Sequence, residues 1–443
     1  MTVVLRRHRL ITMVTGLTLL AGVGACDSLA PPDQDPWLAG ASREGPAAAW
    51  TVRVAIGGHQ VAVLGDVVVV TDERALLGLD LATGRQRWRR DVAGEYSISV
   101  AGGLVAQQTK DGPLEVVDPA TGSTRWRDDR PGWRHVIRQE AVYADDCATR
   151  PRAKQAGCVI ESRELADGAT RWRVPATVSG VRDDQIGSRV PVAPASGRYL
   201  LAGIGDRARP FGAVDTGTGR PLKGRIGLNG WYAFVVDDVL VSTDHDPPRG
   251  DRRCTVTVTS VAAANGAARW SGAIYSGQRS DSECHKTLAD RESGAAFIGT
   301  GSRVAAATEG GRPQVVDLAT GDTVWAADKP GAPIDGYGSA LLVRQYADQG
   351  PFSLLDFDSG QERWTVPDTG LPGGSASWAS AVTGGLVAVS GASGDRPFVL
   401  VYDVDSGQQL GRFPSWLAGA GDDWVAVTRG TGVKELILEF IRF

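Results

Sequence analysis

A nine-residue segment recurs along the chain and constrains its fold more than any other feature. The sequence DLATGRQRW at residues 80–88 reappears as DPATGSTRW at 118–126, DLATGDTVW at 317–325 and DFDSGQERW at 356–364. We call this segment the clip. Aligned on its glycine, the chain contains eight copies, at Gly84, Gly122, Gly168, Gly219, Gly266, Gly321, Gly360 and Gly407. A spacing of roughly 40–50 residues is typical of folds that repeat one supersecondary unit.

Each position of the clip has a role that its residue type predicts. Aspartate four residues before the glycine can accept hydrogen bonds from turn amides, and it occurs as Asp80, Asp118, Asp215, Asp317, Asp356 and Asp403. Glycine adopts the left-handed conformation that such a turn requires. Tryptophan four residues after the glycine can bury about 150–250 Å² against a neighbouring sheet; it occurs as Trp88, Trp126, Trp172, Trp270, Trp325 and Trp364. We therefore predict that the clip is architectural.

The segments around the clips predict the fold class. An apolar run precedes each clip, and a second strand-like run lies further upstream, so each repeat contains about four short antiparallel strands. This is the pattern of a β-propeller blade, and we predict an all-β chain with a single β-propeller over residues 47–443. Residues 47–55 and the C-terminal strands together supply one further blade, which closes the ring.

The sequence supports two different counts of the blades. Eight clips and the closing blade give a strict count of nine. We expect eight blades, because eight is the usual number in a large ring, and we expect that one of the degenerate repeats, at Gly219 or Gly266, is not a full blade.

The N-terminus predicts export and anchoring. Residues 1–25 have a basic start, an apolar stretch and a small-residue end, as a signal peptide does. The following Cys26, after Val23-Gly24-Ala25, resembles the cysteine of the bacterial lipoprotein box, which implies that it carries the lipid. A plain secretory signal with an incidental cysteine remains the alternative, and the export route, general or twin-arginine, stays open. Residues 26–46 predict a flexible tether, so we expect the protein on the outer face of the cell membrane.

The net charge and the cysteine content limit which partners the protein could bind and which disulfide or metal sites it could contain. Without residues 1–25 the formal net charge falls from −4 to −7, which argues against nucleic acid as a partner. Four cysteines then remain besides Cys26, and an even number in an exported chain favours disulfides. We pair Cys147 with Cys158, which bracket a polar segment, and Cys254 with Cys284, although three connectivities are open. The cysteine spacing does not fit a zinc site, and we predict no metal.

The repeat D-x-x-T-G-x-x-x-W after an apolar strand resembles that of the pyrroloquinoline-quinone (PQQ) type of propeller. That family contains quinoprotein alcohol dehydrogenases and a propeller lipoprotein of the outer-membrane assembly machinery. The enzymes of the family combine a catalytic aspartate, a calcium site with glutamate and asparagine ligands, and adjacent cysteines. Here no two cysteines are adjacent, and the only asparagines are Asn229 and Asn265. We therefore expect no PQQ, no calcium, no catalytic residue and no enzyme.

These observations predict a function class and not a specific partner. We expect a monomeric, lipid-anchored, non-catalytic scaffold that binds an extracytoplasmic protein. A propeller that senses a small molecule and a PQQ-dependent dehydrogenase are the alternatives. Loops on rigid scaffolds carry recognition, so the polar insertions are where we expect binding; they lie around 144–157, 179–190, 244–253 and 276–294.

Overall fold

The computed structural model divides the chain into two units, residues 1–41 and residues 42–443. All residues that the structure describes lie in the second unit: 43–55, 60–92, 96–109, 113–130, 133–146, 158–176, 178–181, 197–204, 211–226, 232–236, 238–246, 253–278, 299–300, 302–308, 311–344, 352–366, 379–393, 396–430 and 435–443. The predicted signal peptide and Cys26 lie outside these residues. Among the described residues, we find no helix with the length and apolar character needed to span a membrane.

The described residues of this unit form nine antiparallel sheets of four strands each, and eight of these sheets use strands that are consecutive in sequence. The first three consist of β2 (Val61–Leu64), β3 (Val67–Asp72), β4 (Ala75–Asp80) and β5 (Gln86–Asp91); β6 (Tyr96–Ala101), β7 (Leu104–Thr109), β8 (Leu114–Val117) and β9 (Thr124–Asp128); and β10 (Arg134–Ile137), β11 (Ala141–Asp145), β12 (Cys158–Glu164) and β13 (Thr170–Ala176).

The next three consist of β14 (Val178–Val181), β15 (Tyr199–Ile204), β16 (Phe211–Asp215) and β17 (Pro221–Ile226); β18 (Tyr232–Val236), β19 (Val239–Asp246), β20 (Arg253–Ala262) and β21 (Ala268–Gln278); and β22 (Gly299–Thr300), β23 (Arg303–Ala307), β24 (Pro313–Asp317) and β25 (Thr323–Ala326). The last two of the eight consist of β26 (Ala332–Tyr337), β27 (Ala340–Arg344), β28 (Phe352–Asp356) and β29 (Glu362–Val366); and β30 (Ala379–Val382), β31 (Leu386–Ser393), β32 (Arg396–Asp403) and β33 (Gln409–Phe413).

The ninth sheet joins the two ends of this unit. Its strand order is β1-β36-β35-β34, from β1 (Trp50–Ala55), β34 (Trp416–Ala420), β35 (Trp424–Gly430) and β36 (Glu435–Arg442). Strand β1 pairs antiparallel with β36, from Trp50 opposite Phe440 to Ala55 opposite Glu435. The indole of Trp50 stacks on the ring of Phe440, with their centroids 4.9 Å apart. This confirms the prediction that N- and C-terminal strands close the last blade.

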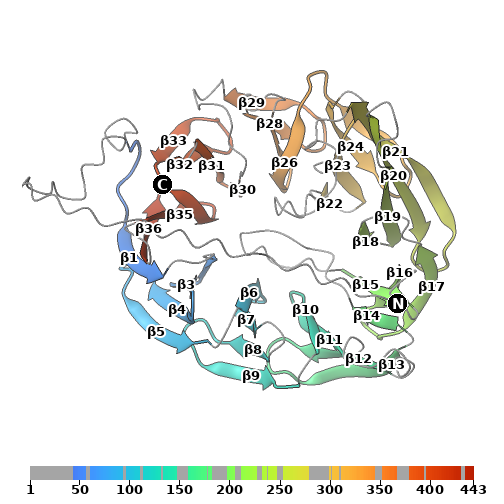
Figure 1. Ribbon diagram of the computed structural model, residues 1–443, viewed down its shortest axis with the longest axis horizontal. Coiled ribbons are helices and arrows are strands. Elements are labelled where there is room, and N and C mark those ends of the chain that lie inside the picture. The colour runs from blue at the N-terminus through green and yellow to red at the C-terminus, as the bar shows by residue number, and fades with distance from the viewer. Residues whose placement is uncertain are drawn as a thin grey trace, which may run out of the picture. The chain divides into compact units, whose positions relative to one another are not determined.

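The sheets follow one another around a ring and form a β-propeller, as predicted (Figure 1). The ring has nine blades, which is the strict count of the sequence, and not the expected eight. The repeats at Gly219 and Gly266 were the candidates for an incomplete blade, but each completes a four-stranded sheet, β14–β17 and β18–β21. Their clips deviate in sequence because backbone hydrogen bonds, and not a tryptophan, join these two blades.

The hydrophobic core lies between the blades. Among the described residues it consists of nine apolar clusters, and each cluster combines side chains of two neighbouring blades. The second and third strands are buried on both faces; β4, for example, keeps only its last residue partly exposed. A sheet that is apolar on both sides is stable only between two others, which explains why the repeats continue until the ring closes.

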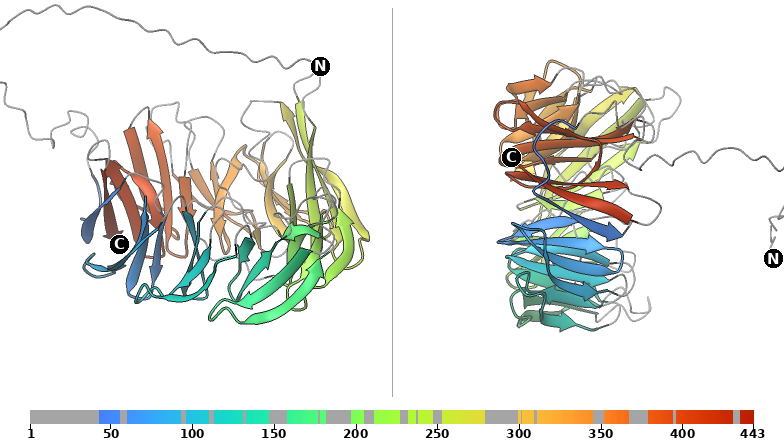
Figure 2. Two further views of the ribbon diagram at one scale, coloured as in Figure 1. Left: turned by 60° about the horizontal axis from the view of Figure 1, so that its bottom comes forward. Right: turned by 90° about the vertical axis from the view of Figure 1, so that its left-hand side faces the viewer.

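The connections between strands fall on two faces of the ring, which the right-hand view of Figure 2 shows edge-on. In a four-stranded antiparallel blade the clips, which join the third strand to the fourth, and the connections from the first strand to the second lie on one face. We call this the clip face. The predicted insertions around 144–157, 179–190, 244–253 and 276–294 lie mostly outside the described residues. The strands that lead into three of them, β11, β19 and β21, end on the opposite face, and β14 ends on the clip face.

Candidate functional site

The clip aspartates hold the turns through hydrogen bonds to their own loops. Asp80 accepts bonds from the amide (2.9 Å) and the hydroxyl (2.7 Å) of Thr83, and Asp356 accepts the same pair from Ser359 at 3.0 and 2.8 Å. An arginine three residues after the clip glycine then pairs with the same carboxylate, as Arg87 does with Asp80. The hydrogen bond from Arg87 lowers the pKa of Asp80 to about 2. These carboxylates are therefore ionised structural groups.

The clip tryptophans reach across to the next blade. The indole nitrogen of Trp88 donates to the carbonyl of Pro119 at 2.8 Å, and that of Trp364 donates to the carbonyl of Val404 at 2.9 Å. In each case the acceptor lies three residues before the clip glycine of the following blade. The same bond is formed by Trp50, Trp126, Trp172, Trp270 and Trp325.

Each of these indole rings packs against the clip glycine of the following blade. All eight have φ between 68° and 82°. In seven of them an added Cβ would come within 2.5 to 2.7 Å of the tryptophan ring of the preceding blade. The two most regular positions of the repeat, glycine and tryptophan, therefore contact each other between neighbouring blades and not within one blade. Each such contact fixes the spacing and the rotation of one blade relative to the next.

The junction between the β14–β17 and β18–β21 blades lacks the tryptophan. Lys223 occupies its position, and the backbone amide of Gly224 donates to the carbonyl of Ala263 at 3.0 Å. That carbonyl also lies three residues before a clip glycine, Gly266. An added Cβ on Gly224 would lie 2.4 Å from the oxygen of Ala263, so the two backbones are in direct contact. Backbone hydrogen bonding replaces the indole here, which explains why these two repeats are irregular in sequence.

The junction between the β30–β33 blade and the closing blade lacks a clip, because the first and last strands of the ring, β1 and β36, pair in the closing blade. Glu44 fills this place: its amide and carbonyl bond to the carbonyl and amide of Arg412 at 3.1 and 2.7 Å. Arg43 pairs with Glu439 at 2.9 Å and lies over the ring of Phe413, 5.4 Å from its centroid. Among the described residues, Arg43 and Glu44, which lie inside the predicted tether 26–46, thus already contact the ring.

Three junctions in the described part of the ring contain a glutamate with a largely enclosed side chain that pairs with arginine, a feature that we did not predict. Glu115, Glu161 and Glu439 occupy the same place on the third strand of their blades, and their side chains are 12%, 2% and 5% exposed. Their partners across the junctions are Arg90, Arg130 and Arg43, respectively. A glutamate seven residues before a clip glycine, within an apolar strand, is the sequence signal that could have identified two of them. Removal of either partner would leave the other as an unpaired charge between the blades, which is strongly destabilising.

The junction around Glu161 also contains a network of buried polar groups. Asp128 accepts hydrogen bonds from Arg130, and its Oδ2 lies 3.2 Å from Nε2 of His135, whose side chain is fully buried. Burial alone would raise the pKa of Asp128, but the hydrogen bonds from Arg130 and His135 outweigh it and hold this pKa well below its usual range. Arg130 also stacks on Trp133, 3.5 Å from the ring centroid. This network joins two blades and leaves His135 without access to a substrate.

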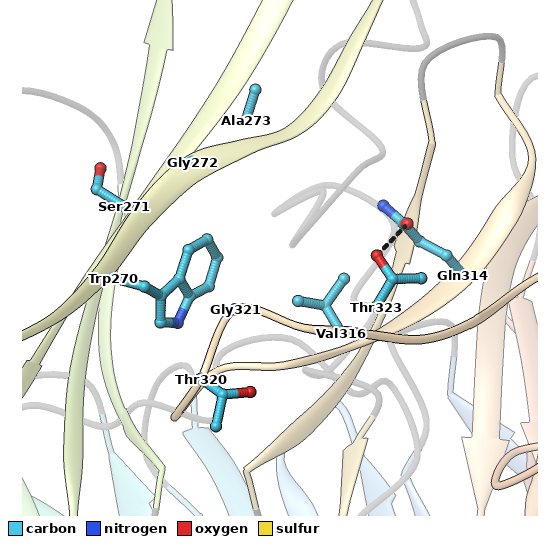
Figure 3. A pocket seen from close by; sticks show the side chains of 9 residues that line it. All are labelled: Trp270, Ser271, Gly272, Ala273, Gln314, Val316, Thr320, Gly321 and Thr323. Carbon is cyan, nitrogen blue, oxygen red and sulfur yellow. Dashed lines mark hydrogen bonds between the residues drawn. The ribbon is translucent and has the colours of Figure 1, made fainter.

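One cleft of about 310 Å³ opens between the β18–β21 and β22–β25 blades (Figure 3). Its lining residues come from the outer strand β21 and from the third strand, clip and fourth strand of the next blade: Trp270, Ser271, Gly272, Ala273, Gln314, Val316, Thr320, Gly321 and Thr323. Trp270 lies on one side, and Gln314, Val316 and Thr323 lie on the other. The Thr323 hydroxyl donates to Oε1 of Gln314 at 3.4 Å. The lining is neutral and rich in hydrogen-bonding groups.

The predicted cysteine and metal features are only partly within the described residues. Cys158 lies buried at the start of β12, and Cys254 lies in β20, opposite Gly277. Cys147 and Cys284 lie outside the described part of the chain, so both disulfides stay predictions. Within that part, no group of three or more histidine, cysteine, aspartate or glutamate side chains could hold a metal ion.

Comparisons with known proteins agree with this architecture. The sequence model of the family described as "Outer membrane protein assembly factor BamB" matches residues 37–252 and 254–365, well over half of the chain. None of the curated protein sequences matches the chain.

Solved structures also align with most of the chain. BamB from Moraxella catarrhalis is 14% identical over 90% of this chain and 100% of its own, with a TM-score of 0.43. The quinohemoprotein alcohol dehydrogenase ADHIIG from Pseudomonas putida HK5 is 16% identical over 89% of this chain and 76% of its own, with a TM-score of 0.41. The repeat, the ring and the family match lead to one assignment: the chain belongs to the BamB family of PQQ-like β-propellers.

Proposed function

We propose that this protein is a lipid-anchored, extracytoplasmic scaffold that binds another protein and performs no catalysis. The observation that carries the proposal is the ring itself, whose blades are locked by tryptophan contacts and buried ion pairs at successive junctions. A rigid ring presents surfaces of fixed geometry, which lowers the entropic cost of binding a partner. The name of the family, an assembly factor of outer membrane proteins, supports a role in protein interaction.

The anchoring part of the proposal depends on Cys26 and the signal sequence before it. A lipid on Cys26 would hold the ring at the outer face of the cell membrane, at the end of the tether. Mass spectrometry of the mature N-terminus tests this point directly. A mature chain that begins at Cys26 with a diacylglyceryl group is the expected result. A chain cleaved elsewhere, or one with an unmodified Cys26, would rule out lipid anchoring.

The binding part is tested by cross-linking in the native membrane, followed by affinity capture and mass spectrometry of the full-length protein. One dominant, reproducible protein partner is expected. A chain with the ring deleted after the tether serves as the control, because it keeps the anchor and loses the propeller. Equal capture by both chains would contradict a scaffold role for the ring.

The two alternatives predict different outcomes of binding experiments. A PQQ-dependent dehydrogenase would copurify with quinone and calcium in amounts equal to the protein, which absorbance and elemental analysis would detect. A sensor for a small molecule would show no protein partner but a ligand-dependent rise in melting temperature. We expect neither result.

A further inference from the structure

The cleft between the β18–β21 and β22–β25 blades corresponds to a space that is filled in another junction. Between the β2–β5 and β6–β9 blades, Arg90 occupies this space, six residues after the clip glycine Gly84. Its guanidinium donates to the carbonyl of Gly122 at 2.7 Å, to the hydroxyl of Thr124 at 2.9 Å and to the carboxylate of Glu115. The guanidinium, whose N–H donors point in several directions, thus donates hydrogen bonds to three acceptors of the next blade.

The open cleft keeps the three acceptor positions and lacks the arginine. When the two blades are aligned on their clip glycines, Gly321 corresponds to Gly122 and Thr323 corresponds to Thr124. Gln314 corresponds to Glu115 in the same alignment. All three residues of the open junction line the cleft. The hydroxyl of Thr323 donates to Gln314, as that of Thr124 donates to Glu115 at 3.2 Å.

The residue in the position of Arg90 is Gly272, which has no side chain and leaves the space empty of protein atoms. Gln314 is 6% exposed. A glutamate in its place would put a charge in this buried position, and the neutral amide avoids the cost of burying it.

The other glutamate junctions show that the guanidinium can arrive from different parts of a chain. Arg130 follows the outer strand of its blade and reaches Glu161, whereas Arg43 reaches Glu439 from 396 residues away in sequence. The hydrogen-bond acceptors between two blades therefore bind a guanidinium regardless of which segment of the chain carries the arginine. An arginine on another protein satisfies the same requirement.

The charges around the cleft favour a cation over a neutral amide. Asp317 and Asp322 belong to the clip that forms one wall of the cleft, and neither forms an ion pair with any described residue. In the equivalent clip, Asp118 pairs with Arg125 at 2.7 Å. The position of Arg125 is occupied here by Val324. Within the described part of the chain, this clip thus carries two carboxylates without a paired cation, next to three neutral acceptors.

We propose that this cleft is a receptor for an arginine side chain of a partner protein. The guanidinium donates to the carbonyl of Gly321 and to the side-chain oxygens of Gln314 and Thr323, with Trp270 on its other side. Asp317 and Asp322 supply the countercharge. This inference rests on the proposed function, because it assigns the partner's contact point on the scaffold.

The first experiment titrates the full-length protein with N-acetyl-arginine methylamide and follows the indole N–H resonance of Trp270 by NMR. We expect a saturable shift, and the neutral citrulline analogue should bind at least about tenfold more weakly, because it keeps the shape and loses the charge. The variant Gly272→Arg should abolish the shift, since its own side chain fills the cleft. Gly272→Ala should retain it.

Both variants are expected to fold, because the position accepts a side chain. Gly272 is not among the glycines with positive φ, and an added Cβ would lie 3.4 Å from the Trp270 ring, an ordinary contact. The melting temperature of Gly272→Arg should equal or exceed that of the wild type. An absent response of the wild type to the arginine probe, or an unchanged response of Gly272→Arg, would overturn the proposal.

A second experiment repeats the membrane cross-linking with the two variants. Loss of the partner in Gly272→Arg, with capture retained in Gly272→Ala, would support the assignment. Full capture by Gly272→Arg would overturn it and leave the scaffold function intact. If even the wild type captures no partner, the scaffold proposal fails and the arginine titration alone decides what the cleft binds.

Discussion

At the scale of single residues, the contact between a clip glycine and the tryptophan of the preceding blade is the unit of the ring. Trp364 is the most buried of the clip tryptophans at 9% exposure, and it combines an indole hydrogen bond with close packing on Gly407. Sequence spacing places the tryptophan in the returning strand, but it does not say which blade receives it. That depends on the rotation between sheets, which no local pattern encodes.

Truncation of Trp364 should separate the two parts of this contact. We expect Trp364→Phe to cost about 1 kcal/mol, because it loses mainly the hydrogen bond to Val404. Trp364→Ala should cost about 3–5 kcal/mol, because it also leaves a cavity. Thermal and denaturant unfolding measure both. Trp416→Ala is the control: Trp416 is 40% exposed, and its loss should change the free energy of unfolding by less than about 0.5 kcal/mol.

Replacement of a clip glycine should cost more than backbone strain alone. Gly360 and Gly65 have similar φ, 72° and 61°, but an added Cβ meets Trp325 at 2.6 Å in the first and nothing within 4 Å in the second. We expect Gly65→Ala to cost about 1 kcal/mol from strain. Gly360→Ala should cost about 1–3 kcal/mol more, because the ring of Trp325 must move. Equal losses in calorimetry would show that the indole contact contributes nothing.

At the scale of strands, neighbouring blades also contact each other through their first strands. Asp335 on β26 accepts a hydrogen bond from the amide of Gly336 at 2.8 Å, and it also bonds to Ser380 and Val382 of β30 in the next blade. Burial raises the pKa of Asp335 to about 6 despite these hydrogen bonds. The carboxyl of Asp335 therefore loses its proton near pH 6 and not near the usual pKa of an aspartate.

This raised pKa predicts a pH dependence of stability. The folded state binds the proton of Asp335 more tightly than the unfolded state does, so stability should fall as the pH rises from about 4 to about 6. The loss should be at most about 3 kcal/mol, and Asp335→Asn should remove this part of the pH dependence. Melting temperatures of both proteins between pH 4 and pH 7 measure it. Parallel curves would mean that Asp335 titrates alike in both states.

At the scale of the whole molecule, the N-terminal strand holds the ring closed. Strand β1 covers the edge of β36, Trp50 stacks on Phe440 and donates to the carbonyl of Leu81 in the next blade, and Arg43 pairs with Glu439. Without this segment, β36 would present an unpaired edge, which is a site for aggregation.

A chain that starts at residue 56 should therefore self-associate or unfold at a clearly lower temperature than one that starts at residue 43. Both chains lack residues 1–42, so they differ only in the closing segment, residues 43–55. Size-exclusion chromatography and calorimetry distinguish them. A monomeric shorter chain with an unchanged melting temperature would show that closure depends on the apolar contacts between blades alone.

The sequence by itself determined the fold class, the repeat, the turn chemistry and the closure by both termini, because these follow from local periodicity and residue type. It also contained the correct blade count, although the irregular repeats at Gly219 and Gly266 pointed to a smaller ring. Only the tertiary structure decided that those repeats form full blades, because the backbone of Gly224 replaces an indole across the junction. It alone decided that Arg90 fills one junction while Gly272 leaves another open, since contacts between blades join residues that are distant in sequence.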